Sequence, residues 1–110
     1  MDGNKATGIK HDQGKPEMAL VDAYFIEQLA AVLTFGARKY SSENWRGGLS
    51  TKRTLSAVLR HIFSFLKGED NDPESGLPHL AHAACGLMFT IWMTKHKPEL
   101  DDRYKNEQET

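Results

Sequence analysis

The segment TKRTLSAVLRHIFSFLK, residues 51–67, carries the clearest structural pattern in the chain. Its apolar side chains recur three or four positions apart, a spacing that places them along one face of an α-helix. Ser50 or Thr51 can cap the start of this helix, and Gly68 is the residue type expected just after its end. The apolar positions are Leu55, Val58, Leu59, Ile62, Phe63 and Leu66. The pattern therefore predicts a helix over residues 51–67 that buries one face.

Two further helices are predicted on either side of this one. The first runs from about Asp22 to Lys39, with Asp22 as its N-cap. The second runs from about Ser75 to Lys95, with Pro78 in its first turn, where the missing N–H costs nothing. Because no strand pattern is present, we predict an all-α fold, a compact bundle of three principal helices. These three helices have more apolar surface than one small bundle can bury, so we also expect self-association.

The whole-chain properties set limits on organisation and on function. The 110 residues predict one domain over residues 1–97, which begins with an irregular arm over residues 1–20, followed by a charged, flexible tail over residues 98–110. The net charge of −1 argues against a nucleic-acid partner. The single cysteine, Cys85, indicates a reducing compartment. Residues 81–93, the most apolar segment, are too few to span a bilayer, and the N-terminus lacks a signal-peptide pattern. We expect a cytoplasmic protein without a membrane partner.

The segment GEDNDPESGLPHLAHAA, residues 68–84, brings four carboxylates close to two histidines. His79 and His82 lie three residues apart, so a helix would place both on one face. In one interpretation they bind a metal together with Asp72 or Glu74. In the other they cap or pack the first helical turn, while the acids are solvated near a helix N-terminus. The spacing alone slightly favours the second interpretation.

Two polar segments, KHDQGKPE (10–17) and ARKYSSENWRGG (37–48), combine cations, glycines and a side-chain amide. Such a mixture suits a nucleotide, whose base can stack on an aromatic ring and whose phosphates need Lys or Arg. Lys15, which follows a glycine, resembles a phosphate-binding lysine, although the surrounding residues are not a Walker A loop. Trp45 can equally be a core residue, and the residues alone leave both roles open. For Arg60 and His61 the residues favour a surface cation and a hydrogen-bonded histidine at the edge of the apolar face.

In combination these segments resemble a known family. The pattern K-x-D-x-G-K-P, then F-G-x-x-K-Y-x-x-x-N-W, then L-R-H, then G-E-D-x-D-x-E-S-G-x-x-H-x-x-H is matched in order from Lys10 to about Ala84. It resembles the phage-encoded dATP/dGTP diphosphohydrolase N-terminal domain family, which is distantly similar to the all-α pyrophosphohydrolases of the MazG type. MazG-type enzymes hold Mg²⁺ with E-x-x-E, which this chain lacks; Glu69–Asp72 forms an E-x-x-D in a loop.

The resemblance implies divalent-metal-dependent hydrolysis of a purine (deoxy)nucleoside triphosphate to the monophosphate and pyrophosphate, in the host cytoplasm. We expect Mg²⁺ or Mn²⁺ as cofactor. The expected roles are metal binding by Glu69, Asp70 and Asp72; catalysis by His79, His82 and Glu74; and substrate binding by Lys15, Lys39, Tyr40, Asn44, Trp45, Arg60 and His61. The alternative is a phage protein that sequesters a nucleotide without cleaving it.

Overall fold

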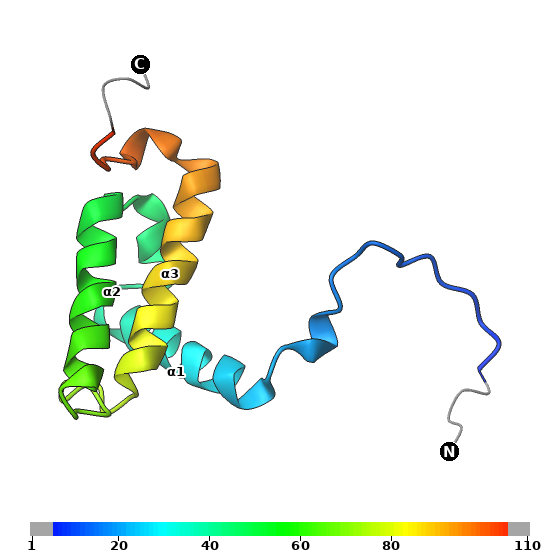
Figure 1. Cartoon of the computed structure of the whole chain (residues 1–110), viewed down its shortest axis with the longest axis horizontal. Helices are drawn as coiled ribbons and strands as arrows, with labels where there is room; N and C mark the ends of the chain where they lie inside the picture. Colours follow the sequence, from blue (N-terminus) through cyan, green and yellow to red (C-terminus); the bar gives the residue numbers. More distant parts are fainter. Residues whose placement is uncertain (1–5, 106–110) are drawn as a thin grey trace.

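The computed structural model describes residues 6–105, and within them the chain is helical (Figure 1). The three α-helices are α1 (Ala23–Lys39), α2 (Thr51–Leu66) and α3 (His79–His96). Three short 3₁₀ helices accompany them, η1 (Met18–Leu20), η2 (Asn44–Gly47) and η3 (Pro98–Leu100). The described residues form no strand beyond an isolated bridge between Asn71 and Pro78. The prediction of an all-α chain with three principal helices is confirmed for this part of the chain.

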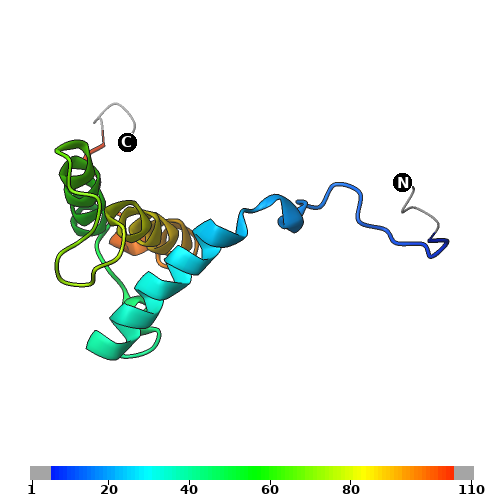
Figure 2. The ribbon, with the colours of Figure 1, turned by 90° about the horizontal axis from the view of Figure 1, so that it is seen from below.

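Helices α2 and α3 lie side by side and antiparallel, and α1 crosses them at one end (Figures 1 and 2). The close approach of α2 and α3 depends on Gly86, because a Cβ at this position would lie 2.4 Å from Cγ2 of Val58. On the other side of α3, Ala81 and Cys85 pack with Val32 of α1 in the core. Helix α3 therefore contacts both other helices, which explains why its sequence is apolar on most of its surface.

The capping residues that the sequence predicted for α1 and α2 are confirmed by the structure. The Asp22 carboxylate accepts a hydrogen bond of 2.8 Å from the N–H of Phe25, and the Ser50 hydroxyl accepts one of 3.1 Å from the N–H of Arg53. Gly68, just after α2, has a φ of 104°, a left-handed conformation that favours glycine.

The predicted start of the third helix at Ser75 was wrong, because α3 begins at His79. Gly76 has a φ of 72° and Pro78 has an extended ψ of 135°, so neither residue is helical and both precede α3. A residue that precedes proline is disfavoured in helical conformation, which accounts for the break at Leu77. A hydrogen bond from the N–H of His79 to the carbonyl of Asp70 holds the acidic loop against the start of α3.

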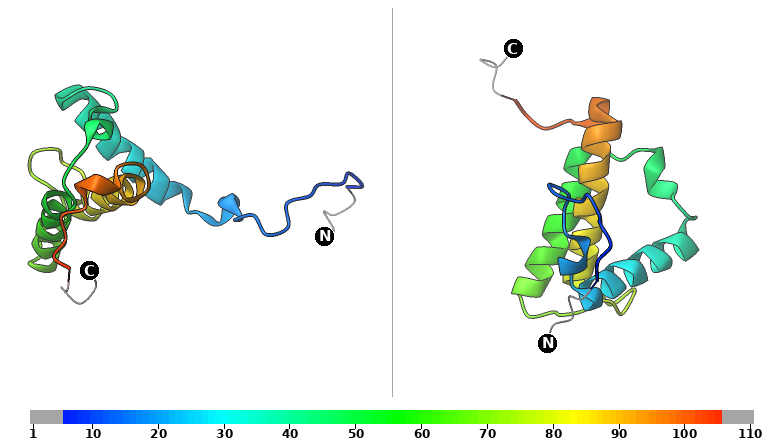
Figure 3. Two further views of the ribbon diagram at one scale, coloured as in Figure 1. Left: turned by 90° about the horizontal axis from the view of Figure 1, so that it is seen from above. Right: turned by 90° about the vertical axis from the view of Figure 1, so that its right-hand side faces the viewer.

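The described part of the N-terminal arm extends away from the helices (Figure 3). Its residues are exposed, and so are Tyr24, Phe25 and Ile26 in the first turns of α1. Self-association, which would cover such apolar side chains, stays a prediction. No helix of the described residues is long and apolar enough to cross a membrane.

The segment after α3 folds back onto the start of α2. The Asp102 carboxylate accepts a hydrogen bond of 2.8 Å from the N–H of Lys52 and one of 2.9 Å from the hydroxyl of Ser50. A domain boundary at residue 97 stays a prediction, and residues 106–110 lie outside the described residues. The beginning of the expected flexible tail is nevertheless held by specific contacts, which its charged composition did not indicate.

Candidate functional site

A hollow of about 1010 Å³ lies between the three helices, the loop after α1 and the acidic loop. Ligand sites for small molecules have volumes of about 300–1,000 Å³, so this hollow can accept a molecule of nucleotide size. It is lined by nine of the residues that we expected in a site: Lys39, Tyr40, Asn44, Trp45, Arg60, His61, Asp72, Glu74 and His82. Folding thus gathers side chains that are separated by up to 43 positions in the chain.

The other four predicted residues lie elsewhere. Lys15 is in the extended arm, where its N–H bonds to the carbonyl of Asp12, and it does not line the hollow. Asp70 is exposed and contacts the site through its backbone carbonyl, which accepts from the N–H of His79. Glu69 and His79 pair with one another beside the hollow. Among the described residues, Glu69, Asp70 and Asp72 do not converge as the metal-binding set that we expected.

Three histidines from α2 and α3 meet at the end of the helix pair next to the acidic loop. Nδ1 of His61 lies 2.8 Å from Nδ1 of His79. The rings of His61 and His82 stack, with centroids 4.7 Å apart and an angle of 12° between their planes. His61 therefore belongs to the histidine cluster that the sequence indicated only for His79 and His82.

The contact between Glu69 and His79 determines where His79 carries its proton. Oε1 of Glu69 lies 2.7 Å from Nε2 of His79, and a carboxylate only accepts, so Nε2 carries the hydrogen. In neutral His79 the lone pair is then on Nδ1, and His61 donates its own Nδ1–H to that atom. His79 is only 3% exposed, so its ring is held between these two partners.

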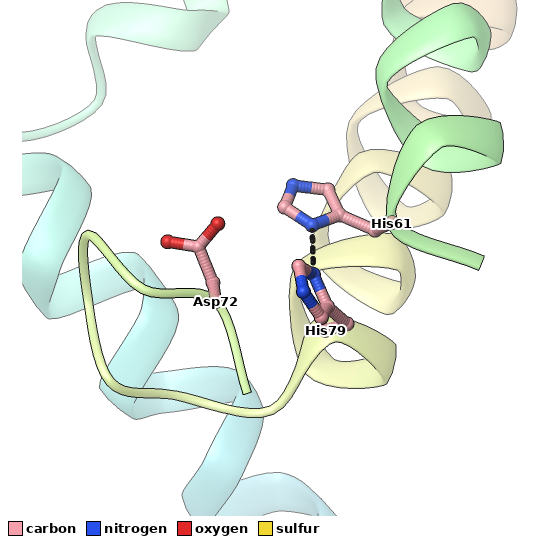
Figure 4. Close-up of side chains that lie close together, drawn as sticks. All are labelled: His61, Asp72 and His79. Atoms are coloured by element: carbon pink, nitrogen blue, oxygen red, sulfur yellow. Dashed lines mark hydrogen bonds between the residues drawn. The ribbon is translucent and has the colours of Figure 1, made fainter. Parts of the chain in front are cut away.

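Asp72 completes the cluster from the acidic loop (Figure 4). A ligand atom of Asp72 lies within 4.8 Å of ligand atoms of both His61 and His79. Its Oδ2 accepts hydrogen bonds from the N–H groups of Ser75 (3.0 Å) and Glu74 (3.1 Å), which fix the carboxylate. Desolvation raises the pKa of Asp72, but these N–H donors and the nearby histidine rings outweigh it, so the pKa lies below its usual value. Asp72 is ionised at neutral pH.

The histidines that line the hollow are neutral at pH 7. Burial is the main cause that lowers the pKa of His61, and the neighbouring His82 and His79 lower it further. Burial also lowers the pKa of His82, against the opposing effect of Asp72. Nε2 of His82 lies 2.7 Å from the hydroxyl of Ser75, which orients the ring. Neutral imidazoles of this kind can bind a metal ion or accept a proton.

Trp45 is half-buried and its ring is already in contact with other side chains. Phe89 stacks on it with centroids 4.4 Å apart, and Trp92 meets it edge to face at 5.2 Å. The Arg46 guanidinium lies 4.4 Å from the Trp45 ring centroid. Of the two roles that the sequence left open for Trp45, these contacts favour packing, whereas Tyr40 is 66% exposed at the rim.

Two residues of the site, Arg53 and Ser75, were not predicted from the sequence, whereas Arg46 belongs to the segment 37–48 that we expected to suit a nucleotide. Arg53 lines the hollow and precedes Arg60 by seven positions, a spacing that places both on one face of a helix, so this signal was available. Ser75 is a fixed position of the family pattern to which we gave no role.

The fold and the site define an all-α domain whose hollow joins histidines and carboxylates to cationic and aromatic side chains. The chain belongs to the family described as dATP/dGTP diphosphohydrolase, N-terminal, because the model of that family matches residues 5–103. A protein of Salmonella phage PMBT28 named dATP/dGTP diphosphohydrolase is 50% identical over 97 residues. The match covers 88% of this chain, and the chain spans 33% of the length of that relative. No solved structure matches the chain significantly.

Proposed function

We propose that the domain binds a purine (deoxy)nucleoside triphosphate in the hollow and hydrolyses it to the monophosphate and pyrophosphate. The proposal depends on one observation above all, that the hollow places several cations beside a cluster of histidines and carboxylates. The cations are Lys39, Arg46, Arg53 and Arg60. Membership of the family and the name of the phage relative support a nucleotide substrate.

The cationic side chains account for phosphate binding. A triphosphate carries several negative charges, which Arg and Lys bind through charge-assisted hydrogen bonds. Arg53 and Arg60 approach the hollow from α2, and Lys39 approaches it from the end of α1. The base would stack on exposed Tyr40, since the ring of Trp45 is in contact with Phe89 and Arg46.

The histidine and carboxylate side chains account for hydrolysis. Attack on a phosphorus atom requires a water molecule that loses its proton, and neutral His82 can accept that proton as a general base. The Ser75 hydroxyl, 2.7 Å from Nε2 of His82, holds the ring in place. A bound divalent cation would neutralise phosphate charge and lower the pKa of water. Asp72, His61 and His79 would hold it, since their ligand atoms converge.

A panel of deoxynucleotides tests the proposal. The full chain is incubated with dATP, dGTP, dCTP and dTTP and a divalent metal, products are separated by chromatography, and binding is measured by calorimetry. We expect monophosphate and pyrophosphate from a purine substrate. His82→Gln should remove turnover and leave most of the binding, because its role is confined to proton transfer. Arg60→Ala should weaken binding, whereas Arg38→Ala, an exposed cation outside the hollow, should not.

The outcomes separate the two interpretations of the sequence. If a nucleotide binds tightly and is recovered intact, the protein sequesters its ligand and does not hydrolyse it. Failure to bind any of the four nucleotides would overturn both.

A further inference from the structure

We propose that His61, Asp72 and His79 form a binding site for a divalent transition-metal ion such as Zn²⁺, Co²⁺ or Mn²⁺, and that this site discriminates against Mg²⁺. The inference deepens the proposed function, because the metal would lie beside the phosphate-binding side chains. Its evidence is nevertheless separate, since it comes from the donor atoms alone. Within residues 6–105 no other group of three His, Cys, Asp or Glu residues brings its ligand atoms within 4.8 Å of one another.

The two histidines present their nitrogens to a common point. Nδ1 of His61 and Nδ1 of His79 are 2.8 Å apart. Two nitrogens that each bind one ion at about 2.0–2.1 Å lie about 2.8–3.0 Å from each other at octahedral angles and about 3.3–3.4 Å at tetrahedral angles. The rings would therefore move by only a few tenths of an ångström. His61 would lose its Nδ1 proton to solvent and take one up on Nε2, so that it stays neutral and both Nδ1 lone pairs face the ion.

Glu69 prepares His79 for this role. Its Oε1 accepts the hydrogen of Nε2 at 2.7 Å, so the lone pair of neutral His79 is on the nitrogen that faces His61. Metal-binding histidines usually donate their second N–H to a carboxylate or carbonyl, which fixes the ring and makes the metal-binding nitrogen more basic. A packing role for His79 would not need an acid at this position, because any carbonyl could accept the hydrogen.

The chemical type of the three ligand atoms determines which metal ions fit the site. Mg²⁺ takes oxygen ligands and retains its waters, whereas imidazole nitrogen suits transition-metal ions. Two nitrogens and one carboxylate therefore do not fit the Mg²⁺ that the sequence led us to expect, but they fit Zn²⁺ and Co²⁺ and, less tightly, Mn²⁺. Three protein ligands also leave coordination positions open for water or a phosphate oxygen. Because His61 and Asp72 line the hollow, those positions can face a bound triphosphate.

Metal binding without nucleotide tests the inference. Tag-free protein is stripped with a chelator, dialysed and titrated with Zn²⁺, Co²⁺, Mn²⁺ or Mg²⁺ by calorimetry, and Co²⁺ binding is also followed by visible absorption. We expect one Zn²⁺ or Co²⁺ per chain, weaker binding of Mn²⁺, and no measurable binding of Mg²⁺ at the same concentrations. Addition of Zn²⁺ should shift the imidazole ¹⁵N resonances of His61 and His79 and leave His96 unchanged, since His96 stacks on Trp92 at the other end of α3.

Matched variants distinguish a built site from adventitious binding. His61→Ala should remove Zn²⁺ binding, and Glu69→Gln should weaken it by about 10- to 100-fold, the usual effect of losing a group that orients a ligand. His96→Ala should bind like the unaltered protein. Because buried His79 can be needed for folding, His61→Ala and Glu69→Gln are the decisive variants, each checked by circular dichroism.

Two results would overturn the inference: Mg²⁺ binding as tight as that of Zn²⁺, or Zn²⁺ binding that is unchanged in folded His61→Ala. Its failure is distinguishable from failure of the proposed function. Zn²⁺ bound at His61 without nucleotide turnover supports the site and contradicts hydrolysis. Turnover with Mg²⁺ but no binding of Zn²⁺ or Co²⁺ would support hydrolysis and contradict the transition-metal site.

Discussion

Lys39 and Glu74 form an ion pair with 2.7 Å between Nζ and Oε2, although 35 positions separate them in the chain. The pair joins the end of α1 to the acidic loop beside the hollow. Their side chains are 40% and 60% exposed, and a pair this exposed contributes little to stability because solvent screens it. The hydrogen bond to Glu74 is the main cause that raises the pKa of Lys39, so the ammonium stays charged beside the hollow. We infer that the pair positions the cation more than it stabilises the fold.

Substitution of either partner should therefore change nucleotide binding more than stability. If the proposed function is correct, Lys39→Ala weakens triphosphate binding, because a phosphate-binding cation is lost. Glu74→Gln should strengthen it, because Lys39 loses its competing anion. Calorimetric titration with a purine triphosphate measures both effects, and thermal unfolding should show little change in either variant. Weaker binding in Glu74→Gln would instead indicate that the Glu74 carboxylate participates in the site, as its expected catalytic role requires.

Gly86→Ala should destabilise the packing of α2 against α3. The added Cβ would lie 2.4 Å from Cγ2 of Val58, a buried and β-branched side chain with little freedom to move. We expect a loss of about 1–3 kcal/mol in the free energy of unfolding, the usual cost of overpacking a core. Chemical denaturation measures it.

Gly36→Ala is the matched control for that substitution. A Cβ at Gly36, in α1, meets nothing within 4 Å, so alanine should stabilise the helix by about 0.5–1 kcal/mol. The double variant Gly86→Ala/Val58→Ala should lose less than the sum of its parts, because Val58→Ala removes the clashing methyl group. Equal effects of alanine at both glycines would contradict the close contact.

Cys85 should be unreactive in the folded protein. Its side chain is buried in the core, and burial raises the pKa of the thiol to about 11. At pH 8 only about one thiol in a thousand would be ionised, and the thiolate is the reactive form. Reaction with a disulfide reagent should be slow in buffer and fast in denaturant. Rapid labelling of the native chain would show that the core around Cys85 opens easily.

The contact of Asp102 with the start of α2 should contribute to stability. Ser50→Ala removes the helix cap and the hydroxyl that donates to Asp102, and it should cost about 1 kcal/mol. Asp102→Asn should also destabilise the protein, because the amide replaces a charged acceptor of the Lys52 N–H with a neutral one. Arg103→Ala is a control on the same segment, since this side chain pairs with Asp101 and leaves the cap intact.

The contribution of Asp102 should also depend on pH. The hydrogen bond from the Lys52 N–H is the main cause that lowers the pKa of Asp102 in the folded chain. The contribution is therefore fully present above the unfolded value of about 3.9 and is lost as the pH falls through the lower folded value. The difference in stability between the unaltered protein and Asp102→Asn, measured by denaturation, should decrease as the pH falls below about 4. A constant difference at all pH values would show that the charge of Asp102 is not involved.

Much of the fold was readable from short segments of sequence. The spacing of Val58 and its apolar neighbours predicted α2, and Asp22 and Ser50 cap the helices that they were expected to cap. Such signals are local, because a helix and its caps depend on residues within four positions of each other. The start of α3 was predicted too early, because we placed Pro78 in the first turn of the helix. In the structure Gly76 has a left-handed conformation, and the helix begins at His79, one residue after the proline.

What the sequence determined by itself is the set of helices, their caps, the family and a group of side chains that suit a nucleotide. What only the tertiary structure decided is which of those side chains meet: His61 with His79, Glu69 with His79, Asp102 with Ser50. These contacts join segments that are 10 to 52 positions apart, and their geometry follows from how closely α2 approaches α3 at Gly86 and how the acidic loop turns before His79. Periodicity reveals which face of each helix is buried, but the pairing of polar groups depends on the packing of those faces against one another.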